Sequence, residues 1–245
     1  MPIPTDIPPI SPPPESTPSE PIPPLRHGDR LTRAEFERRY HAMPHIKKAE
    51  LLDGVVYMPS PVSLHHGTPH FNLIGWMSFY SFSTPGVQGS DNGTIRLDLD
   101  SEPQPDAFLY ILPSFGGQAL HSADGYVEGS VDLVGEISVT SAQIDLGIKF
   151  ALYRRNGVRE YIVWRVLDRA IDWFVLRDGE YDPMPLGPNG VYRSVALPGL
   201  WLDPAALIGG NLPRVSQVAL QGVATPEHAA FVAQLQQAAA RGAGS

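Results

Sequence analysis

The sequence predicts an α/β domain, in which a mixed β-sheet is flanked by helices and preceded by a disordered, proline-rich tail. Strand-like apolar runs alternate with stretches that have the apolar spacing of amphipathic helices. Hydrophobic residues make up 42% of the 245 residues, which is enough for one substantial core. Proline gathers at the start of the chain, where residues 1–24 contain 11 of the 26 prolines.

Residues 1–27 are expected to form the tail, because proline lacks a backbone donor and proline-rich sequence cannot build a core. Such a segment is partly polyproline II, and the alternative role is a docking peptide for a proline-binding module. The domain follows at 28–208. Residues 209–245 are expected to be a linker and a short helix, in which Thr225 is the cap and Pro226 the first helical residue.

The first part of the domain is expected to hold two helices and a hairpin. Thr32 and Glu35 have the spacing of a capping box and begin the first helix. Asp53-Gly54 between two apolar runs is a strong hairpin signal. Residues 64–82 have an apolar face at helical spacing, which predicts the second helix.

The remaining elements alternate between strands and one helix. Ser141 can cap a helix over 142–156, which Asn156-Gly157 would stop. The runs 104–111 and 131–138 are expected to pair as a hairpin across the polar loop between them. Further strands are predicted at 86–90, 94–98, 160–164, 170–176 and within 191–202.

Four polar residues lie in or beside these apolar runs: Glu50, Asp106, Glu136 and Lys149. A carboxylate in an apolar strand is costly to desolvate unless it is paired or holds a metal ion. Three such carboxylates with one lysine favour a metal-dependent phosphodiesterase site over a structural ion pair. The alternative for each carboxylate is a helix cap or an arginine partner.

The chemistry of such a site needs few groups. Carboxylates bind Mg²⁺ or Mn²⁺, and the ion polarises a phosphate and lowers the pKa of a bound water. A nearby lysine can orient that water and stabilise developing charge. Neighbouring strands lie about 4.8 Å apart, so Asp106 and Glu136 fit this arrangement if their strands pair.

Several motifs follow one another in an order that is informative: Glu50 to Pro59, Pro105-Asp106, Glu136-Ile137-Ser138, Asp145-Leu146-Gly147-Ile148-Lys149, Tyr153, and Gly157-Val158-Arg159-Glu160-Tyr161. Together they resemble the Uma family of restriction-endonuclease-like proteins, within the PD-(D/E)xK nuclease superfamily. The resemblance covers about residues 30–205. It implies a restriction-endonuclease-like core, with the site at one edge of the sheet, and a Mg²⁺-dependent endonuclease (or one using Mn²⁺) that acts on DNA.

The resemblance also implies roles for single residues. Asp106 and Glu136 match the motif aspartate and glutamate and would bind the metal. Glu50 matches the upstream acidic residue, as a further metal ligand or a group that positions water.

One departure from the superfamily pattern concerns the lysine. It usually follows the motif glutamate by two residues, where this chain has Ser138, so that its role would pass to Lys149. Ser141 and Asp145 would hold the junction of strand and helix and orient Lys149. The alternative is a surface ion pair between Asp145 and Lys149, worth under about 1 kcal/mol.

Three histidines, His65, His66 and His70, form a second candidate site. His66 and His70 are four residues apart, as a zinc site on a helix requires, but Pro69 between them suggests that His66 precedes the helix. His66 could instead support the carboxylates or contact phosphate, and the remaining alternative is a surface histidine.

Other candidates have two interpretations each. Trp164 and Trp173 could stack on bases, but their apolar strands favour core packing. Arg154, Arg155 and Arg159 could form a phosphate-facing patch or complement a helix C-terminus.

Composition narrows the class of protein. The net charge of −8 argues against strong non-specific DNA binding, although metal ions can bridge to phosphate. Cysteine is absent, which excludes disulfides and thiolate zinc sites. Neither a signal peptide, a membrane span nor a nucleotide-binding glycine loop is predicted, so a cytoplasmic protein is expected.

Three functions therefore compete. The first is a metal-dependent DNA endonuclease, the second a catalytically silent binding module of the same fold, and the third a different metal-dependent hydrolase. The acidic charge favours the second and third, whereas the full set of three carboxylates and a lysine favours the first. Superfamily nucleases often work as dimers, so a homodimer is compatible with each.

Overall fold

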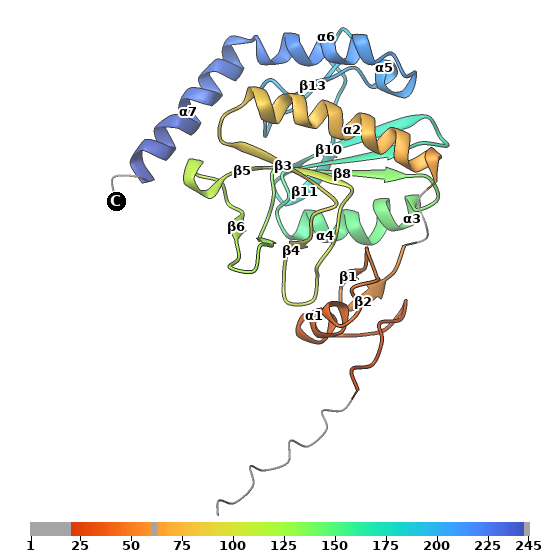
Figure 1. The fold of residues 1–245 in the computed structure, drawn as a ribbon. Helices are drawn as coiled ribbons and strands as arrows, with labels where there is room; N and C mark the ends of the chain where they lie inside the picture. The colour runs from red at the N-terminus through yellow and green to blue at the C-terminus, as the bar shows by residue number, and fades with distance from the viewer. Residues whose placement is uncertain (1–20, 60–62, 243–245) are drawn as a thin grey trace, which may run out of the picture.

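A mixed six-stranded sheet forms the centre of the protein (Figure 1). The structure is a computed structural model and describes residues 21–59 and 63–242. The sheet has the order β11-β10-β9-β8-β5-β3 and consists of β3 (Val87–Asp91), β5 (Ala107–Ile111), β8 (Leu133–Ser138), β9 (Glu160–Arg165), β10 (Ala170–Arg177) and β11 (Glu180–Pro183). Only β8 and β9 pair in parallel; the other neighbours are antiparallel. The prediction of a mixed α/β fold is confirmed. Most of the expected tail, residues 1–20, lies outside the described residues.

Helices cover both faces of this sheet (Figure 1). Helix α2 (Leu64–Ser83) lies against β3, β5 and β8 on one face. The opposite face carries a helical segment made of α3 (Ala142–Ile144), a π-helical turn η2 (Asp145–Lys149) and α4 (Phe150–Arg155). Side chains of a strand alternate between the faces, so Leu109 packs in the core beneath α2 whereas Phe108 packs in the core beneath α4.

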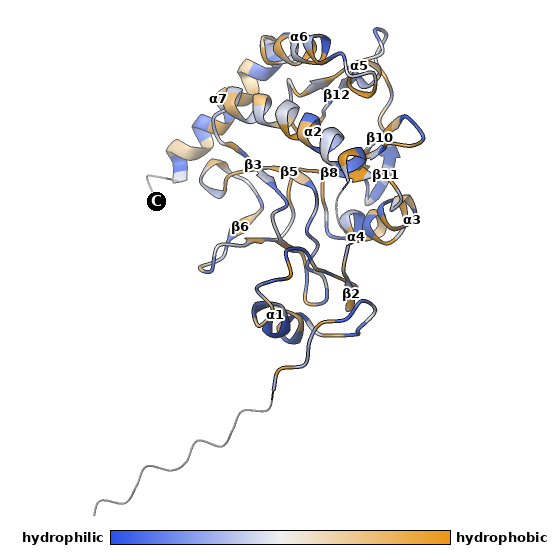
Figure 2. Ribbon diagram, turned by 45° about the vertical axis from the view of Figure 1, so that its right-hand side comes forward, coloured by the Kyte–Doolittle hydropathy of each residue, from blue (hydrophilic) through white to orange (hydrophobic). Residues whose placement is uncertain are grey.

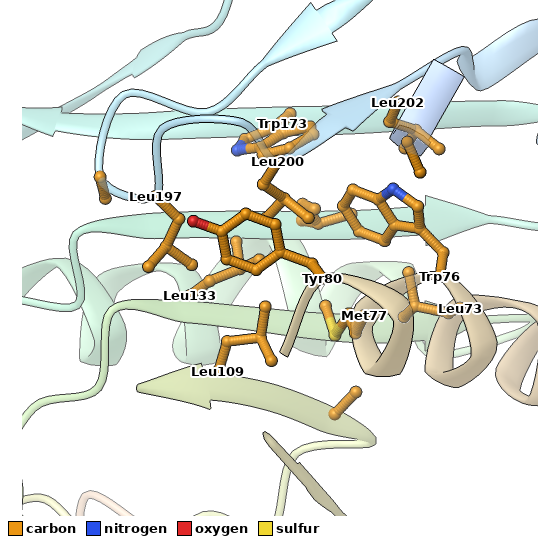
Figure 3. Packing of buried hydrophobic residues seen from close by; sticks show 14 of the residues in the cluster. Leu73, Trp76, Met77, Tyr80, Leu109, Leu133, Trp173, Leu197, Leu200 and Leu202 are labelled. Atoms are coloured by element: carbon orange, nitrogen blue, oxygen red, sulfur yellow. The ribbon is translucent and has the colours of Figure 1, made fainter. Parts of the chain in front are cut away.

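The core beneath α2 contains both tryptophans that the sequence offered as base-stacking candidates. Trp164 and Trp173 are buried, which confirms the alternative of core packing. Trp173 meets Trp76 of α2 edge-on, with 5.8 Å between ring centroids, and Tyr80 lies beside them with Leu133 (Figure 3). This packing fixes α2 over the strands.

The N-terminal part forms a small unit below the large sheet (Figure 1). It comprises α1 (Arg33–His41) and the antiparallel hairpin of β1 (Glu50–Leu52) and β2 (Val55–Tyr57), as expected from Asp53-Gly54. Thr32 caps α1, but Glu35 pairs with arginines of its own helix rather than completing a capping box. Leu51 exchanges backbone hydrogen bonds with Glu102, so the hairpin is tied to the segment that leads into β5.

Small sheets fill the remaining loops. One sheet consists of β4 (Ile95–Arg96), β6 (Leu120–His121) and β7 (Val127–Glu128), and another of β12 (Tyr192–Arg193) and β13 (Trp201–Leu202). A 3₁₀ turn, η1 (Pro113–Phe115), follows β5.

Packed structure begins earlier than the expected domain start at Gly28. Leu25 is buried in the same cluster as Phe36, at least three residues before Gly28.

The C-terminal region contains α5 (Pro204–Ile208), α6 (Leu212–Val223) and α7 (Pro226–Gly242). Where a linker was expected, the structure has α6. Asn211 caps this helix, and a buried stripe of Val215, Val218, Ala219 and Gly222 packs it against α2 and β13.

The hydropathy of the elements matches their positions in the fold (Figure 2). Strands β5 and β8 are mainly hydrophobic, and α1 on the outside is strongly hydrophilic. In the described part of the chain, no helix has the length and apolarity that a bilayer crossing requires.

Candidate active site

The candidate site begins with two carboxylates on neighbouring strands. Ala107 of β5 pairs with Gly135 of β8, so Asp106 and Glu136 follow as the next opposed pair. The N–H of Asp106 lies 3.4 Å from Oε2 of Glu136, and the N–H of Ile137 donates to Oδ2 of Asp106 at 2.8 Å. Both carboxylates are buried. The expected strand pairing is confirmed, although β5 and β8 are interior strands and not the outermost strand of the sheet.

Close packing of α2 brings a histidine to this pair. A Cβ atom on Gly135 would meet Leu73 and Met77 of α2 at 3.0 Å, so glycine lets the helix lie close to β8. As a result, the first turn of α2 lies over Asp106, and Nε2 of His66 is 3.1 Å from Oδ2 of the aspartate. His66 therefore lies where its predicted role of supporting the carboxylate would place it.

The second histidine of this turn contacts the same segment. Nε2 of His70 lies 2.8 Å from the backbone oxygen of Asp106 and 3.1 Å from Oδ1 of Asp91. Helix α2 begins at Leu64, ahead of Pro69, so the expectation that His66 precedes the helix is wrong. Both imidazoles are engaged with aspartates, and these contacts do not support a zinc site.

Lys149 reaches the carboxylates from the opposite face of the sheet. Its Nζ lies 2.9 Å from Oε1 of Glu136 and 2.9 Å from Oε1 of Glu50. The hydroxyl of Tyr153, one turn further on, donates to the same oxygen of Glu136 at 3.0 Å. Because the Lys149 side chain is only 5% exposed, the alternative of a surface ion pair is wrong.

The helix that carries Lys149 changes its pitch just before it. Residues 145–149 form a π-helical turn, where the helix holds one extra residue and its side chains change direction. Such turns are frequent at functional sites. Lys149 ends this turn and is buried with Glu50 and Glu136.

Glu50 joins the site through the N-terminal hairpin. It is the first residue of β1, and its Oε1 accepts the N–H of Gln104 at 2.8 Å as well as Lys149. The structure thus brings together the four residues that the sequence singled out: Glu50, Asp106, Glu136 and Lys149. Lys149 bridges two of the carboxylates, and backbone contacts join the third to Glu136.

A second lysine, which the sequence analysis missed, belongs to the same cluster. Nζ of Lys48 lies 3.0 Å from Oδ1 of Asp106 and 3.3 Å from Oδ1 of Asn92. Lys48 lies two residues before Glu50, so in an extended chain both point to the same side. That spacing was the available signal, but the contact with Asp106 depends on the docking of the hairpin.

The junction between β8 and the following helix is held by hydrogen bonds. Ser141 donates to Oδ2 of Asp145 at 2.6 Å and lies 3.4 Å from the hydroxyl of Ser138. Tyr161 donates to the backbone oxygen of Asp145 at 3.0 Å. Ser141 is the N-cap residue of the helix, as expected, but its side chain makes no capping hydrogen bond. These contacts fix the turn that carries Lys149.

Burial and neighbouring charges set the protonation of the cluster. Burial raises the pKa of Glu136 to about 8, against the opposing effect of the Lys149 ammonium and with a further increase from Asp106. Burial alone would lower the pKa of Lys149, but the carboxylates of Glu136 and Glu50 hold that pKa well above its usual value. The two carboxylates therefore hold Lys149 in its charged form, and burial makes Glu136 harder to ionise than a glutamate in water.

Asp106 behaves in the opposite way. Burial would raise its pKa, but the hydrogen bond with His66 and the charge of Lys48 outweigh burial, and the pKa of Asp106 lies well below its usual range. Two adjacent carboxyl groups thus have pKa values displaced in opposite directions, a pattern typical of catalytic sites.

The donor set fits a hard divalent cation. Mg²⁺ and Mn²⁺ prefer oxygen ligands, and Mg²⁺ is usually bound by one or two carboxylates together with waters and substrate phosphate. Asp106 and Glu136 supply two such carboxylates side by side. Within residues 21–59 and 63–242, no three histidine or acidic side chains are disposed to hold an ion as they stand. Lys149 contacts Glu50 and one oxygen of Glu136, and Lys48 contacts one oxygen of Asp106.

The arginines at the end of α4 do not form a free cationic patch. Each one contacts a carboxylate: Arg154 pairs with Glu180, Arg155 with Asp53 and Asp98, and Arg159 with Asp132. These pairs argue against the phosphate-facing interpretation of the cluster.

Comparison with known proteins identifies the family of this chain and a solved structure with a similar fold. The model of the Uma2 family, described as "Putative restriction endonuclease", matches residues 33–205. No curated protein matches the chain. Among solved structures, a protein from Anabaena variabilis ATCC 29413, titled a "putative nuclease belonging to DUF820", is similar with a TM-score of 0.51 at 10% identity. That similarity covers 70% of this chain and 97% of the other, and at this identity it shows the fold alone. Because the family match spans more than half of the sequence and includes the carboxylate cluster, the chain belongs to the Uma2 family.

Proposed function

We propose that this protein is a Mg²⁺-dependent endonuclease that hydrolyses DNA phosphodiester bonds with a metal-activated water. The observation that carries the proposal is the buried pair of Asp106 and Glu136, with Lys149 at 2.9 Å from the glutamate. A structural ion pair would need one carboxylate and one cation, whereas this cluster concentrates three carboxylates at one point of the sheet.

The residues have distinct roles in this proposal. Asp106 and Glu136 would hold Mg²⁺ or Mn²⁺, and Glu50 would complete the acidic set. When bound, the ion would polarise the phosphate and make a water nucleophilic. Lys149 has three N–H donors and spends two on Glu50 and Glu136 within the described chain, so the third can bind a water or a phosphate oxygen.

DNA is the proposed substrate, and its support comes from the family. The Uma2 family is described as a restriction endonuclease family, and the Anabaena protein is titled a nuclease. The net charge of −8 means that affinity cannot rest on overall attraction to phosphate. It would depend on the metal ion and on local contacts near the site.

A catalytically silent binding module is the second candidate. Two lysines already neutralise much of the carboxylate cluster, and this observation favours a purely structural network. The two candidates differ in one measurable respect, because only the endonuclease requires Asp106 as a charged metal ligand.

Cleavage of nucleic acid tests the proposal. Supercoiled plasmid, single-stranded DNA and RNA are incubated with the protein in Mg²⁺, Mn²⁺ or EDTA. We expect metal-dependent nicking of DNA that Asp106→Asn abolishes and that Glu102→Gln, which alters a buried carboxylate four residues earlier, retains. Cleavage that persists in EDTA or in Asp106→Asn would contradict the mechanism. A folded protein that cuts none of these substrates would favour the silent module.

A further inference from the structure

Of the two lysines that the described chain brings to the site, Lys48 is the more exposed. Its side chain is 23% exposed, compared with 5% for Lys149. Its Nζ lies 3.0 Å from Oδ1 of Asp106. The charges of Glu136 and Glu50 act on it as well, so all three carboxylates of the cluster attract this one ammonium group.

The two oxygens of Asp106 have different partners. Oδ2 is engaged by His66 at 3.1 Å and by the N–H of Ile137 at 2.8 Å. Oδ1 contacts Lys48 alone among the described hydrogen bonds and ion pairs. Oδ1 is therefore the oxygen through which Asp106 can accept a different cation.

A divalent ion and the Lys48 ammonium cannot share this position. A Mg²⁺–oxygen bond is about 2.0–2.1 Å long, so an ion on Oδ1 would lie within a few ångströms of Nζ. At such separations in a partly buried site, the repulsion between the two cations is strong. The divalent ion can therefore bind Oδ1 of Asp106 only if it displaces the Lys48 ammonium.

We propose that Lys48 is an internal cation that competes with the divalent ion for Asp106 and thereby sets the metal affinity of the site. This inference rests on the metal-dependent function proposed above. The metal binds when the Lys48 side chain swings away from Asp106, breaking its contact with Oδ1 and the longer one with Asn92.

Charge supports an exchange at Lys48 rather than at Lys149. With all three carboxyl groups ionised, as metal ligands must be, the two ammonium groups leave the cluster one net negative charge, and exchanging Lys48 for a divalent ion brings it to neutrality. Lys149 holds two buried carboxylates at once, so its departure would leave both unpaired. Lys48 has one carboxylate partner and a route to solvent.

Calorimetry with Mn²⁺ on protein first treated with a chelator tests this assignment. Lys48→Met removes the charge and keeps a side chain of similar length. The matched control is Lys47→Met, because Lys47 is exposed and has only a 3.5 Å contact with the backbone oxygen of Pro44. We expect Lys48→Met to bind Mn²⁺ about tenfold or more tightly than wild type, and Lys47→Met to bind like wild type.

Thermal unfolding supplies a second readout that does not depend on activity. In EDTA, Lys48→Met should melt below wild type, because Asp106 loses its cation. In Mn²⁺ its melting temperature should rise more than that of wild type. Lys48→Gln, which keeps a hydrogen-bond donor without the charge, should behave in the same way, whereas Lys48→Arg should show no gain in affinity.

The outcomes separate this inference from the proposed function. If wild type binds Mn²⁺ and the neutral variants bind it no more tightly, the competition is wrong while the metal site stands. If the wild type and both neutral variants are folded but none binds Mn²⁺, the competition and the metal site are both wrong. If only the neutral variants bind, competition is supported in its strongest form.

Discussion

The ammonium nitrogen of Lys149 lies 2.9 Å from Oε1 of Glu136, although the two residues are 13 positions apart and on different elements. Strand β8 carries the glutamate, and the π-helical turn that follows carries the lysine. The turn itself is held by Ser141 and Tyr161 through Asp145. Lys149 thus contacts the carboxylate of Glu136 from the helical segment that follows its strand.

Replacing Lys149 by methionine should destabilise the protein by about 3–5 kcal/mol, because Glu50 and Glu136 would both remain buried without a cation. Urea unfolding measures the loss. The double variant Glu136→Gln/Lys149→Met should recover part of it, because one of the two unpaired charges is removed. A Lys149→Met protein as stable as wild type would show that the buried contacts with this lysine are unimportant.

His66 should tune the metal site without binding the metal itself. His66→Ala removes the hydrogen bond to Asp106, and the loss of such supporting contacts lowers metal affinity by about tenfold to hundredfold. Mn²⁺ titration measures this effect, and His65→Ala on the exposed side of the same helix turn is the control. Equal affinities for the two variants would mean that His66 does not support Asp106.

Glu102 should make stability depend on pH. Burial, with the adjacent carboxyl of Glu37, raises the pKa of Glu102 to about 8 from the usual 4.5. Between these values the folded protein holds a proton that the unfolded chain has lost, so this contribution to stability falls as pH rises towards 8. Glu102→Gln removes the titration, and its melting temperature relative to wild type should increase from pH 5 to pH 8.5.

The control for this effect is Glu128→Gln, because the Glu128 side chain is 43% exposed and pairs with Arg96, whose charge also acts on Glu102. Its melting temperature relative to wild type should change little with pH. A difference between Glu102→Gln and wild type that is constant from pH 5 to pH 8.5 would contradict the raised pKa.

Local patterns predicted most of the strands and helices correctly, but β6, β7 and β11 were missed. The hairpin at Asp53-Gly54, the helix from Leu64 and the pairing of the strands that hold Asp106 and Glu136 all follow from turn signals and apolar spacing. Helix α6 was missed, although Asn211 is a cap signal and a stripe of small apolar residues follows it. The stripe is buried only through the contact of α6 with α2, which the local sequence does not reveal.

Site residues could be predicted where a polar residue interrupts an apolar run. They could not be predicted where only long-range packing brings the residue to the site. Glu136 could be singled out because strand β8 is buried along its whole length. Lys48 lies in a polar segment where a lysine is unremarkable, and only the docking of the hairpin brings it to Asp106. The π-helical turn beneath Lys149 has no recognisable sequence signal, since its residues also suit an ordinary α-helix.

The central claim is that Asp106 and Glu136 together bind a divalent cation. Its most direct test is calorimetric titration of Mn²⁺ into wild type and into the double variant Asp106→Ala/Glu136→Ala, with circular dichroism to show that both are folded. We predict saturable binding by wild type at a single site and none by the double variant. Equal binding by the two folded proteins would contradict the claim, and so would no binding by wild type, by the double variant and by Lys48→Met.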